Sequence, residues 1–300
     1  MGKMDIGKKM SPVSFFALRL EMVRKEKVIG SGTGFIYKSD RVEQNFLVTN
    51  YHVLTARYPE KPETLLPEFE GSPDEIRFSL LRKEDYQPTY SAVSMLQGGK
   101  PISWLEHKDR ARGVDIIAIP IELPQDVIVI SQMELDLVDD INFEVGSDLF
   151  IIGFPFGFAA GQFFPIWKRG TVASEPLFRP NGLPMFYIDS FTNPGMSGSP
   201  VLAVEIREFI PLESEQARLF EKFQRKELSP LDVISQLDQD SISRSQHKKC
   251  LQLVGIYSSK ILVGLDPANR EDPNIGVVWQ KELIDDIIIN PCYVEHPFLS

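Results

Sequence analysis

The sequence predicts an all-β protein built as a sandwich or barrel. Short apolar or alternating runs recur along the 300 residues, and glycine, proline and asparagine stand between them. Many short strands separated by such turn residues are typical of sandwiches and barrels. The hydrophobic fraction of 43% is enough for a full core without disulfide bonds. We therefore expect strands to form the core over most of the chain.

The expected strands follow one another from the N-terminal region to the C-terminal region. Each is an alternating or continuous apolar run bounded by turn residues. In chain order they are Val13–Leu20, Gly34–Tyr37, Asn45–Thr49, Glu75–Leu81, Asp115–Ile121, Asp148–Gly153, Arg169–Ala173, Met185–Ile188, Pro200–Val204, Leu251–Tyr257 and Ile275–Trp279.

Two segments break the strand pattern. Residues 56–74 are rich in proline and charged residues and predict an exposed loop. Residues 212–248 predict an inserted pair of helices, because apolar residues recur at helical spacing from 217 to 223 and a Ser-Pro pair at 229–230 is a good helix start. The insertion separates two of the expected strands.

The most informative motif is N-P-G-M-S-G-S-P at residues 193–200. It places Ser197 between glycines, after a proline-led turn and before an apolar strand. A nucleophilic serine needs a tight turn that exposes its hydroxyl, and Gly195 lets backbone N–H groups point at a developing oxyanion. Ser199 is the competing serine, and the position of Gly195 favours Ser197 as the nucleophile.

Two upstream motifs supply a base and an acid for this serine. His52 lies in T-N-Y-H-V at residues 49–53, and Asp115 lies in V-D-I-I-A at residues 114–118. A serine is a weak nucleophile unless a neighbouring base takes its proton. His52 would be that base, and Asp115 would hold its tautomer and stabilise the imidazolium.

Five sequence blocks occur in a fixed order along the chain. They are G-S-G-T-G-F at 30–35, L-V-T-N-Y-H-V at 47–53, D-I-I-A-I at 115–119, G-F-P-F-G at 153–157 with G-T-V-A-S at 170–174, and D-S-F-T-N-P-G-M-S-G-S-P at 189–200. These blocks resemble those of the trypsin-like serine peptidases, and within them the HtrA-like branch. The order His, Asp, Ser is that of chymotrypsin-type proteases. Nothing after the last expected helix resembles a PDZ domain.

The resemblance implies two packed six-stranded antiparallel β-barrels with a helix near the C-terminus. The N-terminal barrel, residues 1–125, would carry His52 and Asp115, and the C-terminal barrel, residues 126–300, would carry Ser197. The expected activity is that of a serine endopeptidase that works through an acyl-enzyme and needs neither cofactor nor metal.

The resemblance also implies where the substrate binds. The backbone N–H groups of Gly195 and Ser197 would form the oxyanion hole. No carboxylate stands at the expected floor of the primary-specificity pocket, so the residue before the cleaved bond (P1) is expected to be small or medium and apolar. The residues expected to line the pocket are Phe191, Thr192, Ile256, Tyr257 and Ser258.

Two departures from the family pattern keep a second hypothesis open. Met196 stands where the family usually has Asn or Asp, and Ser199 where it usually has Gly. The alternative is a catalytically weak or latent protease fold that binds peptides or partner proteins. An α/β-hydrolase would need G-x-S-x-G and the order Ser, Asp, His, and the chain has neither.

Charge and composition limit the partners. There are 32 Lys and Arg against 42 Asp and Glu, a net charge of −10 that disfavours nucleic acid. The charged N-terminus and the lack of any apolar stretch near about 18 residues lead us to expect no signal peptide and no membrane span. The expected partners are a protein or peptide substrate, with room for a regulatory partner protein.

Cysteine usage points to a reducing compartment. The only two cysteines, Cys250 and Cys292, suit a cytoplasmic protein. Each has a histidine at a spacing that zinc accepts, in H-x-x-C at 247–250 and C-x-x-x-H at 292–296, but nothing in the sequence brings the two pairs together. We expect the insertion at 212–248 to restrain access to the substrate cleft.

Overall fold

The computed structural model describes residues 10–39, 41–97, 100–161, 163–209, 222–223, 225, 227–229, 246–263 and 271–292. The chain divides into two compact units, one of Met1–Ala203 with Gln252–Ser300 and the other of Val204–Leu251. The expected helical pair at 212–248 falls almost entirely outside the described residues, so the idea that it restrains access to the cleft stays a prediction.

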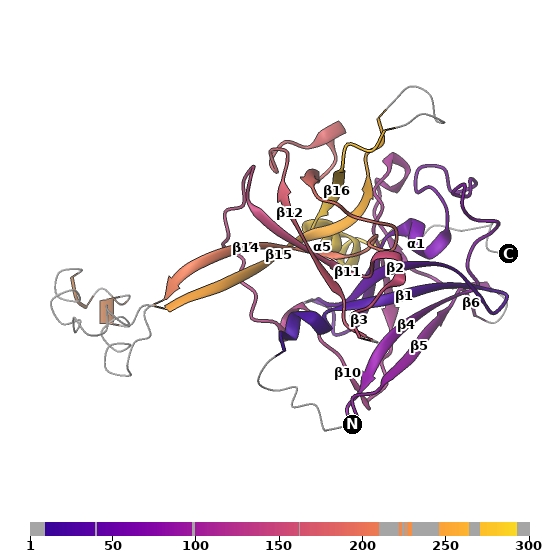
Figure 1. The fold of residues 1–300 in the computed structure, drawn as a ribbon, viewed down its shortest axis with the longest axis horizontal. Helices are drawn as coiled ribbons and strands as arrows, with labels where there is room; N and C mark the ends of the chain where they lie inside the picture. Colours follow the sequence, from indigo (N-terminus) through magenta and orange to yellow (C-terminus); the bar gives the residue numbers. More distant parts are fainter. Residues whose placement is uncertain are drawn as a thin grey trace. The chain divides into compact units, whose positions relative to one another are not determined.

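An eight-stranded antiparallel sheet forms the N-terminal part of the larger unit (Figure 1). Its order is β10-β4-β1-β2-β3-β9-β8, and β5 pairs with β4. The strands are β1 Ala17–Arg24, β2 Lys27–Lys38, β3 Asn45–Thr49, β4 Glu75–Arg82, β5 Pro88–Ser94, β8 Leu105–Glu106, β9 Ile117–Ile121 and β10 Val127–Ile128. A separate pair consists of β6 Leu96–Gln97 and β7 Lys100–Pro101.

The second sheet closes into a six-stranded barrel in the order β11-β12-β13-β16-β15-β14. This confirms the all-β class and the barrel expected for the C-terminal half. Its strands are β11 Asp148–Gly153, β12 Ile166–Val172, β13 Met185–Asp189, β14 Pro200–Phe209, β15 Gln246–Lys260 and β16 Ile275–Gln280. The helices are α1 Tyr51–Thr55 and α5 Glu282–Ile289, and the 3-10 turns are η1 Pro12–Phe15, η2 Arg110–Arg112, η3 Gln132–Glu134, η4 Pro155–Gly157 and η5 Pro180–Gly182.

The start of the first strand differs from the expectation. Residues Pro12–Phe15, which we expected to open a strand at Val13, form η1 instead, and β1 runs from Ala17 to Arg24. Pro12 lacks an N–H and has a fixed φ, so it suits the first position of a helical turn better than a hydrogen-bonded position in a β-strand. The sequence pattern also missed β5, because its first residue, Pro88, weakened the strand signal. The structure places β5 at a sheet edge, where a proline is tolerated.

Helix α5 ties the end of the chain to the N-terminal sheet. It buries Leu283, Ile284, Ile287 and Ile288. Its polar side bonds to the sheet as well: the Tyr37 hydroxyl donates to Asp285 at 2.6 Å, and His107 Nε2 lies 3.0 Å from Asp286. These contacts attach the segment after β16 to the N-terminal part of the fold.

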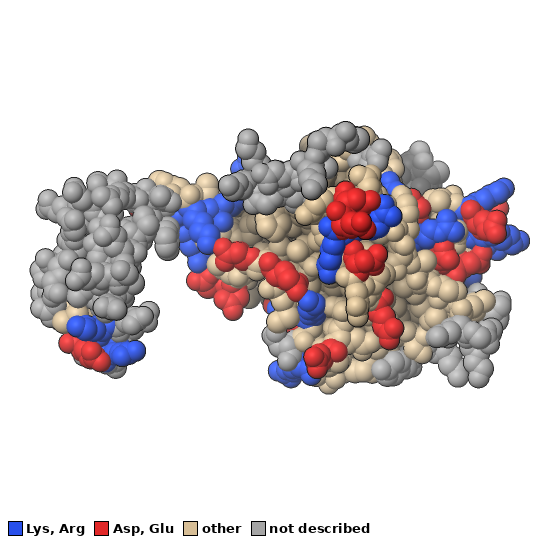
Figure 2. Space-filling view, turned by 90° about the horizontal axis from the view of Figure 1, so that it is seen from below, with Lys and Arg blue, Asp and Glu red and all other residues tan. Residues whose placement is uncertain are grey.

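The surface carries both charges. On the face drawn in Figure 2, Lys and Arg side chains lie beside Asp and Glu. Exposed ion pairs include Arg82 with Asp85 and Arg169 with Asp148. In the part of the chain that the structure describes, no helix has the length and apolar character needed to cross a membrane.

Candidate active site

His52 is presented by the junction between β3 and α1. The strand ends at Thr49, Asn50 keeps an extended backbone (φ −83°, ψ 151°), and α1 places His52 in its first turn. The Asn50 amide donates to the backbone carbonyl of Asp115 at 2.6 Å, and the Thr49 hydroxyl donates to that of Thr33 at 2.7 Å. The residues before His52 are therefore tied both to β2 and to the segment that carries Asp115.

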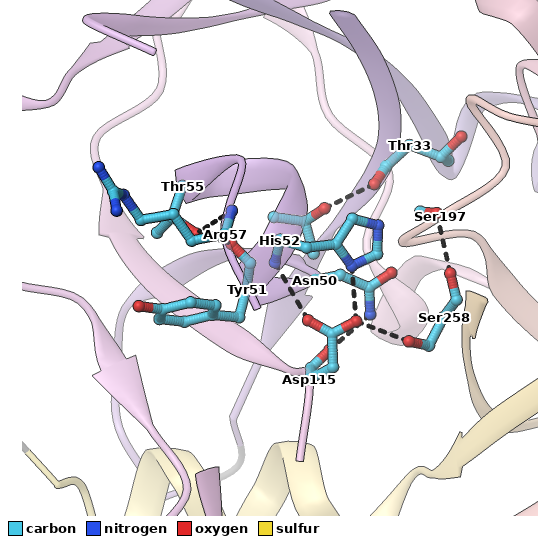
Figure 3. Close-up of polar contacts among 10 residues, drawn as sticks. Thr33, Asn50, Tyr51, His52, Thr55, Arg57, Asp115, Ser197 and Ser258 are labelled. Atoms are coloured by element: carbon cyan, nitrogen blue, oxygen red, sulfur yellow. Dashed lines mark hydrogen bonds and ion pairs between the residues drawn. The ribbon is translucent and has the colours of Figure 1, made fainter. Parts of the chain in front are cut away.

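The carboxylate of Asp115 contacts two nitrogens of His52 (Figure 3). The backbone N of His52 lies 3.1 Å from Oδ1, and the ring Nδ1 lies 2.6 Å from Oδ2. Asp115 is only 5% exposed. Because an ionised carboxylate only accepts hydrogen bonds, Nδ1 carries the proton and Nε2 keeps a lone pair. His52 is therefore held in the tautomer whose Nε2 can take up a proton.

Opposing influences set the pKa of His52. Burial disfavours the imidazolium and lowers the pKa, whereas the charge and hydrogen bond of Asp115 and the charge of Glu68 raise it. The raising influences prevail, so the pKa of His52 lies above its ordinary value of 6.5. The ring is therefore a stronger base than an ordinary histidine.

Ser258 of β15 links the carboxylate to Ser197 (Figure 3). Its hydroxyl donates to Asp115 Oδ2 at 2.6 Å, and its carbonyl oxygen accepts from the Ser197 hydroxyl at 2.8 Å. Within the described residues, the Ser197 hydroxyl makes this bond and none to the His52 ring. The structure thus brings His52 and Asp115 into direct contact and connects Ser197 to them through Ser258.

The backbone around Gly195 is fixed on both sides. The Pro194 carbonyl accepts from the Phe156 N–H at 2.6 Å, and the Gly195 carbonyl accepts from the Thr33 hydroxyl at 2.8 Å. Because C=O and N–H of a trans peptide point in opposite directions, the first bond turns the Gly195 N–H away from Phe156. Among the described residues, neither this N–H nor that of Ser197 has an acceptor. Both donors are free to bind an anionic oxygen.

The two residues that depart from the family pattern have defined places. Met196 and Ser199 are both fully buried, and the Ser199 N–H donates to the Met196 carbonyl at 3.0 Å. A Cβ on Gly153 would lie 2.0 Å from the Ser199 hydroxyl and 3.2 Å from the Met196 sulfur. The missing side chain at Gly153 therefore makes room for both, which is a compensation that the sequence motifs did not reveal.

His52 and Ser197 line a cleft of about 890 Å³, and Asp115 lies buried behind His52. Thr192 and Tyr257 also line the cleft, and their hydroxyl oxygens lie 2.5 Å apart. Ile256 is fully buried and Phe191 is 70% exposed, and neither borders the cleft. Ser258 turns its hydroxyl to the Asp115 carboxylate. Of the five residues expected in the specificity pocket, the structure brings Thr192 and Tyr257 to the cleft surface.

The cleft also contains residues that the sequence motifs did not assign to it. They are Glu68 from the loop after α1, Phe156 from η4, and Lys260 and Asp272, whose side chains pair at 2.6 Å. Phe156 lies in the G-F-P-F-G block, which was a usable signal. The others have no local signal, because only packing decides which loop residues face a cleft.

No metal centre is evident in the described part of the chain. It contains no group of three or more His, Cys, Asp or Glu side chains placed to hold an ion. Cys250 and Cys292 are free thiols. His296, the partner of Cys292 in the C-x-x-x-H pair, lies outside the described residues.

Comparisons with known proteins add a family and several structures. A family model described as a trypsin-like peptidase domain matches residues 32–207. The fold is similar to the serine endoprotease from Yersinia pestis, with 11% sequence identity, a TM-score of 0.44 and coverage of 92% of this chain. The chain spans 62% of the length of that protein.

Two further similar structures are inactive forms of the Rv3671c protease. One is a mutant from M. tuberculosis H37Rv, with 13% identity, a TM-score of 0.40 and coverage of 94% of this chain and 87% of that one. The other has 13% identity, a TM-score of 0.39 and coverage of 94% and 90%. No curated protein sequence matches this chain.

Proposed function

Because the chain belongs to the trypsin-like peptidases, a family of serine proteases, we propose that it is a serine endopeptidase that forms an acyl-enzyme on Ser197. In this proposal His52 is the general base and Asp115 orients it. The observation that supports this assignment most directly is the contact between the His52 ring Nδ1 and the Asp115 carboxylate at 2.6 Å, which leaves Nε2 able to take up a proton.

The reaction follows from these contacts. In this proposal the Ser197 hydroxyl leaves the Ser258 carbonyl and turns to His52 Nε2. As its oxygen bonds to the substrate carbonyl carbon, its proton passes to Nε2, and the Asp115 carboxylate stabilises the imidazolium. The imidazolium then protonates the leaving amine as the C–N bond breaks. A water molecule, deprotonated by His52 in the same way, hydrolyses the ester and restores Ser197.

The N–H groups of Gly195 and Ser197 bind the negative oxygen that forms during each attack. A donor of this kind typically contributes about 2.7–4 kcal/mol to transition-state stabilisation. The Phe156 N–H and the Thr33 hydroxyl hold the two peptide groups that flank Gly195. The Gly195 donor is therefore positioned before substrate binds, which avoids a reorganisation cost for this donor during the reaction.

The P1 side chain meets a pocket that Tyr257 partly fills. The Tyr257 ring is 3% exposed, its hydroxyl contacts Thr192, and a Cβ on Gly276 would lie 2.8 Å from its ring. Burial raises the pKa of Tyr257 to about 12, so the hydroxyl stays neutral. We infer a preference for small apolar P1 residues, since the large Tyr257 ring and Thr192 border the cleft at the place that the proposal gives to P1.

Replacing Tyr257 with alanine should therefore change the P1 preference. We expect kcat/KM for a phenylalanine at P1 to rise about 10-fold or more relative to alanine at P1, because filling or emptying apolar pocket volume changes discrimination by such factors. The measurement is a series of peptides that differ only at P1. Tyr257→Phe keeps the ring and should keep the original preference. An unchanged ratio in Tyr257→Ala would rule out the ring as the determinant.

Fluorophosphonate labelling tests the proposed activity. The intact protein should gain one covalent adduct on Ser197, detected by mass spectrometry of the labelled peptide. Ser197→Ala and His52→Ala should lose the label, and Ser199→Ala should keep it. A folded wild-type protein that does not label would contradict the proposal.

The same experiment decides the second candidate function. The bond from the Ser197 hydroxyl to the Ser258 carbonyl, in place of one to His52, is the observation that favours a latent or weakly active peptide-binding protein. Such a protein would bind peptides in the cleft without labelling. A cytoplasmic location and a regulatory partner protein remain predictions from the sequence.

A further inference from the structure

The cleft has an apolar wall that the proposed acyl-side contacts do not use. Met22, Ile29, Val53 and Phe69 come from the N-terminal sheet and the segments next to it, and Phe156 comes from η4. We call these five residues the apolar wall. Ile29 and Phe69 pack on the core that contains Met22 and Val53. The wall is therefore supported from behind by a packed core.

The position of the wall assigns it to one part of the substrate. In the proposed function, Thr192 and Tyr257 of the C-terminal barrel receive the residue before the cleaved bond. The part of the peptide that follows the cleaved bond continues beyond Ser197, away from these two residues. The N-terminal sheet, the segments next to it and η4 supply a large part of the lining that these contacts do not use, and we assign the segment after the cleaved bond to that part.

Phe156 is the most exposed member of the wall. Its ring is 71% exposed, and its backbone has φ 54° and ψ 26°, in the left-handed region. A residue with a Cβ pays about 1–2 kcal/mol there. This backbone lets the Phe156 N–H bond to the Pro194 carbonyl at 2.6 Å. The ring itself is left exposed at the cleft, where it offers an apolar surface to a ligand.

Glu68 adds a negative charge beside this wall, and this charge also raises the pKa of His52. Its carboxylate is exposed and lines the cleft, and within the described residues it has no ion pair or hydrogen bond. Lys260 and Asp272, two further charged side chains of the cleft lining, pair with each other at 2.6 Å. The net charge of −10 adds a general attraction for cationic ligands.

We propose that the apolar wall binds the substrate segment that follows the cleaved bond, and that Glu68 selects a lysine or arginine in that segment. The inference rests on the proposed function for the direction of the substrate. It concerns binding rather than bond cleavage, so a binding experiment with a protein that cannot form an acyl-enzyme tests it separately.

Peptide binding to Ser197→Ala measures this selection. Fluorescence anisotropy compares peptides that carry one arginine, or its neutral isostere citrulline, at each of the first three positions after the bond. At one of these three positions, the arginine peptide should bind about 3- to 5-fold more tightly than the citrulline peptide, as expected for an exposed ion pair. The preference should shrink as the ionic strength rises. Equal binding at all three positions would overturn the proposal.

Matched variants in the Ser197→Ala background assign the effect to individual residues. Glu68→Gln should remove the discrimination, and Glu68→Lys should make glutamate the preferred side chain at the same position. Glu70→Gln, an exposed glutamate of the same loop outside the cleft lining, should leave it unchanged. Equal effects of Glu68→Gln and Glu70→Gln would contradict the proposal, because net charge alone would then explain the preference.

The aromatic part of the wall has its own matched pair. Phe156→Ala should weaken binding of peptides that extend past the cleaved bond and should not affect peptides that end at it. Phe158, 62% exposed and outside the cleft lining, provides the control Phe158→Ala. Fluorophosphonate labelling of the wild-type protein reports the proposed activity independently, so failure of either idea is recognised on its own.

Discussion

Replacing Ser197 with alanine should lower kcat about 10⁶-fold, and replacing Asp115 with asparagine should lower it about 10⁴-fold. The first change removes the oxygen that, in the proposed function, forms the acyl-enzyme. The second keeps the shape of the site but reverses the proton on His52. An asparagine NH₂ group would donate to Nδ1, so the ring proton would move to Nε2, which could then no longer accept the proton of Ser197.

The pH dependence separates the Asp115 effect from simple unfolding. In the wild-type protein, the acid limb of kcat/KM should lie above pH 6.5, because the Asp115 carboxylate raises the pKa of His52 and the base must be neutral. In Asp115→Asn the limb should move to lower pH. The folded protein binds the His52 proton more tightly than the unfolded chain does. This difference stabilises the fold at pH values below the unfolded pKa of His52, and the stabilisation is lost as the pH rises through the folded pKa.

A surface carboxylate provides the control for these variants. Asp148 pairs with the exposed Arg169, so Asp148→Asn should leave kcat and the pH profile nearly unchanged. Stopped-time assays on a peptide substrate, with circular dichroism to verify folding, give the comparison. If Ser199→Ala lost activity while Ser197→Ala kept it, the assignment of the nucleophile would be wrong.

Gly198→Ala should cause a large loss of stability. Gly198 has φ +87°, and an added Cβ would lie 1.9 Å from the Thr33 carbonyl oxygen and 2.5 Å from the Thr49 hydroxyl. The Thr33 N–H also donates to the Ser197 carbonyl at 2.8 Å, so the two backbones cannot separate without losing this bond. We expect a loss above about 4 kcal/mol in the free energy of unfolding.

Gly146→Ala is the matched control, because it isolates the backbone conformation. Gly146 has φ +88°, and its added Cβ would meet no atom within 4 Å. It should lose only about 1–2 kcal/mol, the cost of a left-handed residue with a Cβ. Urea unfolding of both variants measures the difference. Equal losses would mean that the close approach of Gly198 to Thr33 does not limit stability.

Local patterns were sufficient for the strand-rich fold and for the residue types of the site. The barrel strands at Asp148–Gly153 and Pro200–Val204 were readable because alternating or continuous apolar runs bury one or both faces of a strand. Pro12 and Pro88 obscured the strand pattern. A proline cannot donate a backbone hydrogen bond, so whether a strand can contain it depends on whether that strand lies at a sheet edge.

The arrangement of the site came from contacts between distant segments. Nothing near Ser258 in the sequence indicates that its hydroxyl bonds to Asp115, and nothing near Gly153 indicates that Ser199 fills the space beside it. The Phe156 N–H, which holds the peptide before Gly195, belongs to another loop. Such pairs carry no sequence period, so patterns cannot find them.

The sequence by itself determined the all-β class and the order of a histidine, an aspartate and a serine in turn-bound motifs, because turns and strand periods are local properties of a chain. Only the tertiary structure decided that Ser258 connects Asp115 to Ser197, that the Gly195 N–H has no acceptor among the described residues, and that Glu68 and Phe156 face the cleft. Those outcomes depend on how two packed sheets bring separate loops together, and hydrogen-bond geometry and side-chain volume then decide which atoms meet.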